Sequence, residues 1–166
     1  MADHGRYLAR CVELAREALD DGDDPFGSVL VDSTGRVLAE ARNREATLAD
    51  PTAHPELELA QWAWRNLNTQ ERSSATIYTT GEHCPMCAAA HGWVGLGPIV
   101  FAVSASQLSQ WRAAWGLPTS PVAPLPLAKV LPGTDVTGPV SPYDDLMFTL
   151  HEQAAARRGQ GPAPAP

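Results

Sequence analysis

The sequence predicts an α/β fold, a three-layer α/β/α domain built around a mixed sheet of about five strands. Three observations favour this class. Residues 28–42 have the pattern of a β-hairpin, residues 75–103 have that of a strand, a helix and a second strand, and helical patterns flank both segments. A hairpin pairs its strands antiparallel and a crossover pairs them parallel, so a sheet that contains both is mixed.

The first predicted helix covers residues 3–20, where apolar side chains recur at helical spacing. Cys11 lies on that apolar stripe, so we expect it in the core. The hairpin follows, with strands at residues 28–32 and 37–42 joined by a turn that contains Gly35. These two antiparallel strands open the sheet.

The second predicted helix begins within residues 52–55, because proline is tolerated only in the first turn of a helix. Its buried face should carry apolar residues at helical spacing. Those residues are Leu57, Ala60, Trp64 and Leu67. Trp62 then points away from this face.

The strand–helix–strand unit comes next. Residues 75–80 are rich in β-branched and aromatic side chains and end at Gly81, and residues 99–103 are an apolar run of the same kind. Between them, Pro85 begins a helix that runs to about residue 96. The two strands should therefore lie parallel.

The pattern weakens after residue 103. Residues 106–116 predict a short helix, and the seven prolines between residues 118 and 142 predict an irregular stretch with one strand near residues 127–131. Residues 141–158 predict a closing helix. We therefore expect a single domain of residues 1–158, followed by a disordered Pro/Ala tail of residues 159–166.

Composition restricts the compartment and the partners. No stretch of about 18 apolar residues and no signal-peptide pattern is present, so we expect a soluble cytoplasmic protein without membrane contact. In a reducing compartment, three cysteines favour metal binding or catalysis over a structural disulfide. A formal charge of −7 and a pI near 5.1 disfavour a nucleic-acid partner, which leaves a small molecule as the expected ligand.

Two short motifs indicate the chemistry. Cys84 and Cys87 start a predicted helix, where both sulfurs share one side near the positive end of the helix dipole and thiolates are favoured. His54 and Glu56 stand at another predicted helix start. If the two starts face each other, one nitrogen and two sulfurs form a zinc site with an open position for water, whose pKa the metal lowers to about 7. Glu56 is then placed to carry protons.

The order His-x-Glu and then Cys-x-x-Cys resembles the zinc signature of the cytidine deaminase superfamily. Residues 24–29 and 50–56 further resemble segments of guanine deaminases and tRNA adenosine deaminases. This resemblance implies hydrolytic deamination with one Zn²⁺ per chain, ligated by His54, Cys84 and Cys87, with Glu56 as the proton carrier. It also implies a homodimer, in which Trp62 is a candidate interface residue.

The resemblance also implies contacts to the substrate. An asparagine eleven positions before the zinc histidine, here Asn43, hydrogen-bonds the base in that family. Phe26 matches a residue lining the base pocket, Ala53 precedes the zinc histidine, and the backbone at Gly81 and Glu82 matches a segment that contacts the leaving amino group. Three further candidates are His83 at the pocket rim and Trp111 or Trp115 stacking on the ring.

Departures from the family pattern affect the substrate. His83 stands where a proline usually precedes the first cysteine, and a buried or surface histidine explains it as well as a substrate contact does. Residues 104–111 hold no carboxylate and the tail holds no aromatic residue, although guanine deaminases use both on the purine. We therefore expect a free base such as a cytosine-like ring, a purine or an amino-triazine, with a nucleoside or tRNA adenosine as the alternative.

Two other classes of protein remain open. A Cys-Pro-x-Cys after a strand is also found in thiol redox proteins, although that class does not explain His54 and Glu56. The zinc site is structural, and the domain only binds a partner, if His91 or Cys11 supplies a fourth ligand. His91 follows Cys87 by four positions on the same helix face, but a packed histidine is the commoner explanation.

Overall fold

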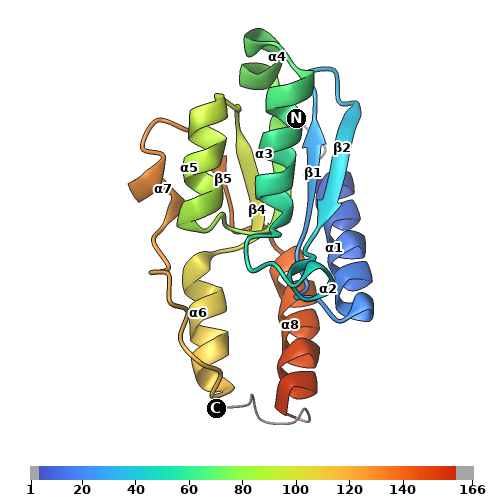
Figure 1. Cartoon of the computed structure of the whole chain (residues 1–166), viewed down its shortest axis with the longest axis vertical. Helices are drawn as coiled ribbons and strands as arrows, with labels where there is room; N and C mark the ends of the chain where they lie inside the picture. The colour runs from blue at the N-terminus through green and yellow to red at the C-terminus, as the bar shows by residue number, and fades with distance from the viewer. Residues whose placement is uncertain (1–3, 160–166) are drawn as a thin grey trace.

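The computed structural model of the chain describes residues 4–159, and a five-stranded sheet lies at its centre (Figure 1). The strands are β1 (Gly27–Val31), β2 (Val37–Arg42), β3 (Thr76–Gly81), β4 (Ile99–Val103) and β5 (Val136–Thr137). Their order is β2-β1-β3-β4-β5; β1 pairs antiparallel with β2 and β3, while β3, β4 and β5 run parallel. The predicted mixed sheet, the hairpin and the crossover are confirmed.

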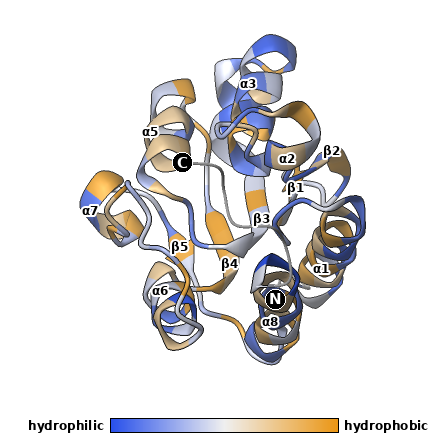
Figure 2. Ribbon diagram, turned by 60° about the horizontal axis from the view of Figure 1, so that its bottom comes forward, coloured by the Kyte–Doolittle hydropathy of each residue, from blue (hydrophilic) through white to orange (hydrophobic). Residues whose placement is uncertain are grey.

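Helices cover both faces of the sheet and complete the three layers (Figure 2). They are α1 (His4–Asp21), α2 (Glu45–Leu48), α3 (Pro55–Asn66), α4 (Thr69–Ser74), α5 (Pro85–Val94), α6 (Ala105–Ala114), α7 (Leu127–Val130) and α8 (Tyr143–Gly159). One core cluster joins α1 and α8 to the sheet, and a second joins α3 and α5 to the other face. Successive strand residues such as Val29 and Leu30 enter opposite clusters, as the pleat requires.

The predicted buried face of α3 is correct for Ala60 and Leu67 and wrong for Trp64. Trp64 is 61% exposed and lies under the guanidinium of Arg72, whereas Trp62 packs against the core. The helix instead buries Glu56, Leu59, Ala60 and Ala63, which recur at helical spacing. The inward position of Glu56 fixes the rotation of the helix, and a count of apolar residues alone cannot detect a buried carboxylate.

The prediction of a strand near residues 127–131 is also wrong, because those residues form the one-turn helix α7 and the strand β5 lies further on. Leu127 is 1% exposed, and its backbone N–H donates to Oε1 of Glu82 at 2.6 Å. A tertiary contact therefore fixes this turn. The short helices α2 and α4 were not predicted.

The two ends of the chain limit what the structure tests. Of the predicted tail of residues 159–166, Gly159 ends α8, and residues 160–166 lie outside the described residues, as does residue 3 of the first predicted helix. Among residues 4–159, no helix has the length and apolar character needed to cross a bilayer.

Candidate active site

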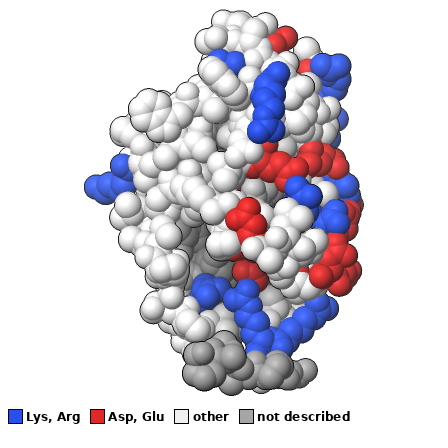
Figure 3. All heavy atoms as spheres, viewed as in Figure 1, with Lys and Arg blue, Asp and Glu red and all other residues white. Residues whose placement is uncertain are grey.

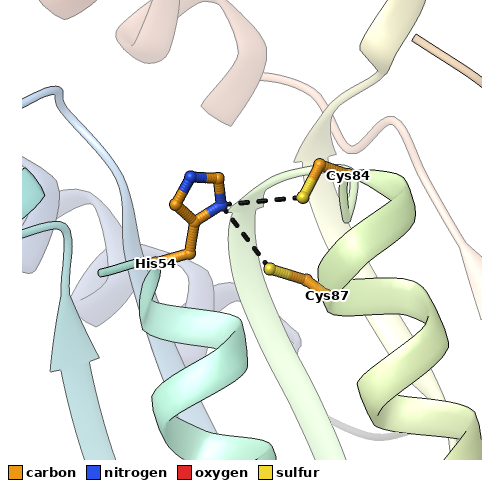
Figure 4. A group of neighbouring side chains, drawn as sticks. All are labelled: His54, Cys84 and Cys87. Atoms are coloured by element: carbon orange, nitrogen blue, oxygen red, sulfur yellow. Dashed lines mark hydrogen bonds between the residues drawn. The ribbon is translucent and has the colours of Figure 1, made fainter. Parts of the chain in front are cut away.

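Two neighbouring helix starts create the site. Pro55 and Pro85 occupy the first position of α3 and α5, and a residue that precedes proline is restricted to extended backbone. His54 and Cys84 adopt such backbone, with ψ of 139° and 163°, and become the N-cap residues. Their side chains therefore leave the two helices at the same level and point toward each other, together with Cys87 from the first turn of α5 (Figure 4).

The spacing of these three side chains fits zinc. Nδ1 of His54 lies 3.6 Å from Sγ of Cys84 and 3.5 Å from Sγ of Cys87, and the three ligand atoms all lie within 4.8 Å of one another. A tetrahedral ion with usual zinc–nitrogen and zinc–sulfur bonds places its ligand atoms roughly 3.5 to 3.8 Å apart. Three protein ligands leave the fourth position open, which is typical of a catalytic zinc site.

Neither proposed fourth ligand reaches this group. Cys11 is fully buried in the cluster that packs α1 against the sheet. Nε2 of His91 lies 2.9 Å from the carbonyl oxygen of Gly97, and the ring of His91 packs 5.3 Å from that of His83. The expectation that Cys11 is a core residue is confirmed, and the geometry gives no support to a metal site closed by either residue.

The protonation states of the three side chains couple metal binding to proton release. The hydrogen bond from the Cys87 thiol, followed by that from His54, lowers the pKa of Cys84 to about 4, and the adjacent Cys84 thiolate raises the pKa of Cys87. Hydrogen bonds to Cys84 and then Glu45 raise the pKa of His54 to about 10. The metal-free site therefore holds a thiolate and an imidazolium, and zinc binding releases protons from it.

Glu45, which the sequence did not single out, orients the imidazole. Its Oε1 lies 3.7 Å from Nε2 of His54, and its Oε2 accepts a 2.6 Å hydrogen bond from Nδ2 of Asn43. The backbone N–H of Glu45 in turn donates to Oδ1 of Asn43 at 3.0 Å. Because the carboxylate takes the Nε2 side of the ring, Nδ1 is left facing the sulfurs. Burial opposes the ionisation of Glu45, but the bonds from His54 and Asn43 outweigh it and lower its pKa.

Glu56 lies two residues after His54, in the first turn of α3, and is 6% exposed. Its Oε1 accepts hydrogen bonds from Oγ1 of Thr79 at 2.6 Å and from Oγ of Ser28 at 3.1 Å. Ser28 and Thr79 are direct partners in the β1–β3 ladder, so one register fixes both donors under α3. Burial raises the pKa of Glu56, against the hydrogen bond from Thr79. Neither donor was predicted, although strand alternation places both on the face that α3 covers.

A pocket of about 420 Å³ opens beside these residues and appears as a hollow on the surface (Figure 3). His54, Glu56 and Cys84 line it, and so do four predicted substrate contacts, which are Phe26, Asn43, Gly81 and Glu82. A side chain on residue 81 would meet the ring of Phe26 at 3.0 Å, so glycine allows that ring to pack against the end of β3. The opposite wall comes from α6, residues 118–125 and Arg158.

Four other predicted contacts lie away from this lining. The carbonyl oxygen of Ala53 accepts the backbone N–H of Arg44, and His83 is 1% exposed with neither ring nitrogen hydrogen-bonded among the described residues. Trp111 and Trp115 pack against the ring of Phe148 on α8. The rotation of α6 turns Ala105, Leu108, Ser109 and Arg112 toward the pocket instead. The sequence identified neither Arg112 nor Arg158.

A mixed α/β sheet with a His–Cys–Cys site and a buried glutamate beside a pocket defines a class of zinc-dependent hydrolytic proteins. The sequence model of the cytidine and deoxycytidylate deaminase zinc-binding region matches residues 1–103, and the chain belongs to this family.

Relatives within the family act on different substrates. The chain is 38% identical over 92 residues to a guanine deaminase of Bacillus subtilis, covering 55% of this chain and 58% of the relative. It is 38% identical over 90 residues to a tRNA-specific adenosine deaminase of Agrobacterium fabrum, covering 54% and 59%. The chain thus spans about three-fifths of the length of the curated relatives that it matches.

A solved structure extends the likeness in fold beyond residue 103. The guanine deaminase of Nitrosomonas europaea superposes with a TM-score of 0.71, covering 93% of this chain and 85% of that chain, at 23% sequence identity. At this identity the likeness concerns the fold alone. It confirms the predicted three-layer architecture. The substrate must therefore be inferred from the residues of the pocket.

Proposed function

We propose that the protein is a zinc-dependent hydrolase that removes the exocyclic amino group of a small nucleobase or base-like heterocycle as ammonia. The observation that carries the proposal is that the Glu56 carboxylate, held by Thr79, lines the same pocket as His54 and Cys84, two members of the His54–Cys84–Cys87 group. His54, Cys84 and Cys87 would hold one zinc ion per chain. When bound, the metal supplies a water molecule that ionises near neutral pH.

Glu56 moves the protons in this proposal. Its carboxylate accepts the proton that the water loses as the new C–O bond forms at the ring carbon. It passes this proton to the ring nitrogen. It then takes the second proton from the new hydroxyl group and gives it to the amino group, so that the C–N bond breaks, a C=O bond forms and ammonia leaves. The bonds from Ser28 and Thr79 to Oε1 hold the carboxylate in place throughout.

In the proposed complex the substrate ring lies in the pocket beside Phe26 and the backbone at the end of β3, which pack against each other. Asn43 is 1% exposed and is fixed by two hydrogen bonds to Glu45, so its amide is held in one orientation at the pocket wall. The backbone of Gly81 and Glu82 faces the amino group that leaves. A free base is the proposed substrate class, since one relative at 38% identity is a guanine deaminase and the formal charge of −7 disfavours an RNA substrate.

A tRNA adenosine deaminase is the second candidate, because several relatives carry that name. The formal charge of −7 disfavours it, since a protein gains most of its affinity for RNA from cationic side chains that neutralise phosphates.

The assembly and the compartment belong to the same proposal. We infer a homodimer, and the indole of Trp93 on α5, which is 88% exposed, offers apolar surface for it. Cys11, Cys84 and Cys87 are all free thiols, which is consistent with a reducing compartment such as the cytoplasm. Residues 1–158 act as one zinc deaminase domain in this proposal.

Substituting Glu56→Gln tests the reaction. Ammonia release from zinc-loaded protein is measured with guanine, cytosine, adenine, their nucleosides, 5-azacytosine, amino-triazines and a tRNA. We expect the variant to keep its zinc and to lose roughly 10²- to 10⁴-fold in rate, because the proton carrier is gone. Glu58→Gln is the matched control, since Glu58 lies two residues away on the same helix with its side chain 47% exposed.

The outcomes separate the classes of protein. Turnover that Glu58→Gln keeps and Glu56→Gln loses supports the proposal. Turnover that survives in Glu56→Gln contradicts the assigned role of Glu56. No ammonia from any compound, with one zinc per chain, contradicts deamination of these substrates and favours a structural metal. Thiol–disulfide exchange by metal-free protein supports the redox alternative.

A further inference from the structure

The outer wall of the pocket is cationic, although the protein as a whole is acidic. Arg112 on α6 and Arg158 near the end of α8 both line it. Figure 3 shows Lys and Arg side chains along the lower edge of the hollow, over the ends of these two helices. An arginine in a substrate pocket requires an explanation, because its guanidinium offers five N–H donors and a fixed positive charge.

The acidic side chains of the pocket already have partners. Glu45 contacts His54 and Asn43, Glu56 accepts from Ser28 and Thr79, Glu82 accepts from the backbone N–H groups of Ala105 and Leu127, and Asp24 pairs with Arg158. None of these carboxylates is paired with Arg112. The carboxylates of the pocket are therefore bonded to groups other than Arg112.

Among the residues that the structure describes, Arg112 makes a single hydrogen bond, in which Nη2–H donates to the carbonyl oxygen of Pro118 at 3.2 Å. Within residues 4–159, no carboxylate oxygen lies within 4.0 Å of its guanidinium nitrogens, in contrast to Arg158. Both guanidinium groups lie near enough to the ring of His151 to lower its pKa. Burial first, and then the charges of Arg112 and Arg158, lower the pKa of His151 to about 3.

The position of Arg112 along α6 indicates which part of a substrate its guanidinium can contact. The backbone N–H of Ala105 donates to Oε2 of Glu82, so α6 begins beside the segment that carries Cys84. Arg112 comes seven residues later, and a helix rises 1.5 Å per residue, so its backbone lies about 10 Å further along the wall. Ser109 and Thr119 line the same stretch. A bare ring held at the metal leaves this end of the pocket unfilled.

We propose that the substrate carries an anionic group, a carboxylate or a phosphate, on the side away from its amino group, and that Arg112 binds this group with help from Arg158. This inference rests on the proposed deamination and replaces the bare base as substrate by a ring that carries an anionic group, in either an anionic heterocycle or a nucleotide. Arg112 donates two parallel hydrogen bonds to the anion, which is the arrangement that guanidinium and carboxylate or phosphate groups adopt. Arg158 adds a second cation, shared with Asp24.

Binding in a catalytically silent background tests this without depending on turnover. Calorimetry is performed on full-length, zinc-loaded Glu56→Gln protein with matched neutral and anionic probes. Cytidine and CMP, guanosine and GMP, and adenosine and AMP test a phosphate, whereas cytosine and 5-carboxycytosine test a carboxylate. Arg112→Gln is compared in the same background with Arg16→Gln, an exposed arginine on α1 outside the pocket lining.

We expect at least one anionic probe to bind about tenfold or more tightly than its neutral partner. Arg112→Gln should weaken that probe by roughly 10- to 100-fold and its neutral partner by less than about twofold, because only the charge-assisted bonds are lost. Arg112→Lys keeps the charge, so its affinity for the anionic probe should lie between those of the parent protein and Arg112→Gln. Arg16→Gln should change the affinity for neither probe. The pair that responds identifies the anion as phosphate or carboxylate.

Equal binding of neutral and anionic probes overturns the proposal, and so does an equal loss of both in Arg112→Gln. Tight binding of a tRNA with no preference among the small probes assigns the cation to an RNA backbone and also overturns it. Failure of the proposed deamination is a separate result, since it shows as absent ammonia release in the parent protein whatever the binding data give.

Discussion

The two walls of the pocket are built in different ways. The inner wall comes from residues 1–103, where β1 and β4 are buried along their whole length and helix starts carry His54 and Cys84. The outer wall comes from residues 104–159, in which residues 118–126 are all exposed and contain four prolines. Only the inner wall falls within the family match.

This difference separates the chemistry from the choice of substrate. His54, Cys84 and Cys87 lie at the starts of α3 and α5, which pack on one face of the sheet, and Glu56 is bonded to Ser28 and Thr79 of that sheet, so a shift there would disturb the core as well. Arg112 and the exposed segment have few buried neighbours, so their side chains can change at small cost to stability. The inner wall lies within the family match, and the outer wall, where we propose that the substrate is selected, lies outside it.

The largest expected effect comes from breaking the inner wall. Cys87→Ser should reduce bound zinc from one per chain to almost none, since a neutral hydroxyl is a poor zinc ligand at neutral pH. Ammonia release should fall by more than the roughly 10- to 100-fold that loss of an outer-shell partner costs. The measurements are metal content after dialysis and the release rate.

Cys11→Ala is the control for that substitution. Cys11 is as buried as Cys87, but it packs between α1 and the sheet. Its loss should lower the midpoint of thermal unfolding and leave the zinc content unchanged. Retention of zinc by Cys87→Ser, or its loss from Cys11→Ala, would contradict the assigned ligands.

The sequence predicted the inner wall better than the outer wall, for physical reasons. Alternating strand residues, a hairpin turn and prolines at helix starts are local signals, and they placed His54, Glu56 and Cys84 at the correct ends of their helices. Asn43 and Phe26 came from the family resemblance, and both line the pocket.

The missed features depend on contacts that no local pattern encodes. The rotation of α3 follows from a buried carboxylate, and the turn of α7 follows from the bond between Leu127 and Glu82. On α6, Trp111 appeared suited to stack on a ring, yet it packs against α8 and leaves Arg112 to face the pocket. An apolar side chain buries itself wherever a partner surface exists, and the sequence does not specify that surface.

The next prediction sharpens the contrast by using His151, an α8 residue whose ring lies 5.0 Å from that of Phe26. Its pKa in the folded protein is about 3, because of burial and then Arg112 and Arg158, against about 6.5 in an unfolded chain. Between pH 6.5 and pH 3, His151 binds a proton in the unfolded state but stays neutral in the folded state. The stability that neutral His151 provides is therefore complete above pH 6.5 and is lost as the pH falls toward 3.

One proton changes the free energy of unfolding by about 1.4 kcal/mol per pH unit, so His151 should account for roughly 3 kcal/mol between pH 6 and pH 4. Urea unfolding at several pH values measures this for the parent protein and for His151→Gln, which does not titrate. The variant should show a slope that is smaller by about one proton. Parallel slopes in the two proteins would mean that His151 is protonated in the folded state.

The smallest expected effect concerns Glu82, which joins the two walls. Its carboxylate accepts the backbone N–H of Ala105 at 2.8 Å and that of Leu127 at 2.6 Å, so one side chain from the inner wall fixes the start of both α6 and α7. Glu82→Gln replaces one acceptor oxygen by an NH₂ group, which cannot accept either donor. One N–H should then lose its partner, at a cost of about 2 kcal/mol in the free energy of unfolding.

Urea unfolding of Glu82→Gln, with the exposed Glu152→Gln as the matched control, measures that cost. The zinc content should stay at one per chain, because the metal ligands lie on α3 and α5. The affinity for an anionic probe should fall together with the stability, because Arg112 is positioned by α6. An unchanged stability in Glu82→Gln would show that the outer wall is held by the packing of α6 on α8, and that the two walls are coupled through the core instead of through this carboxylate.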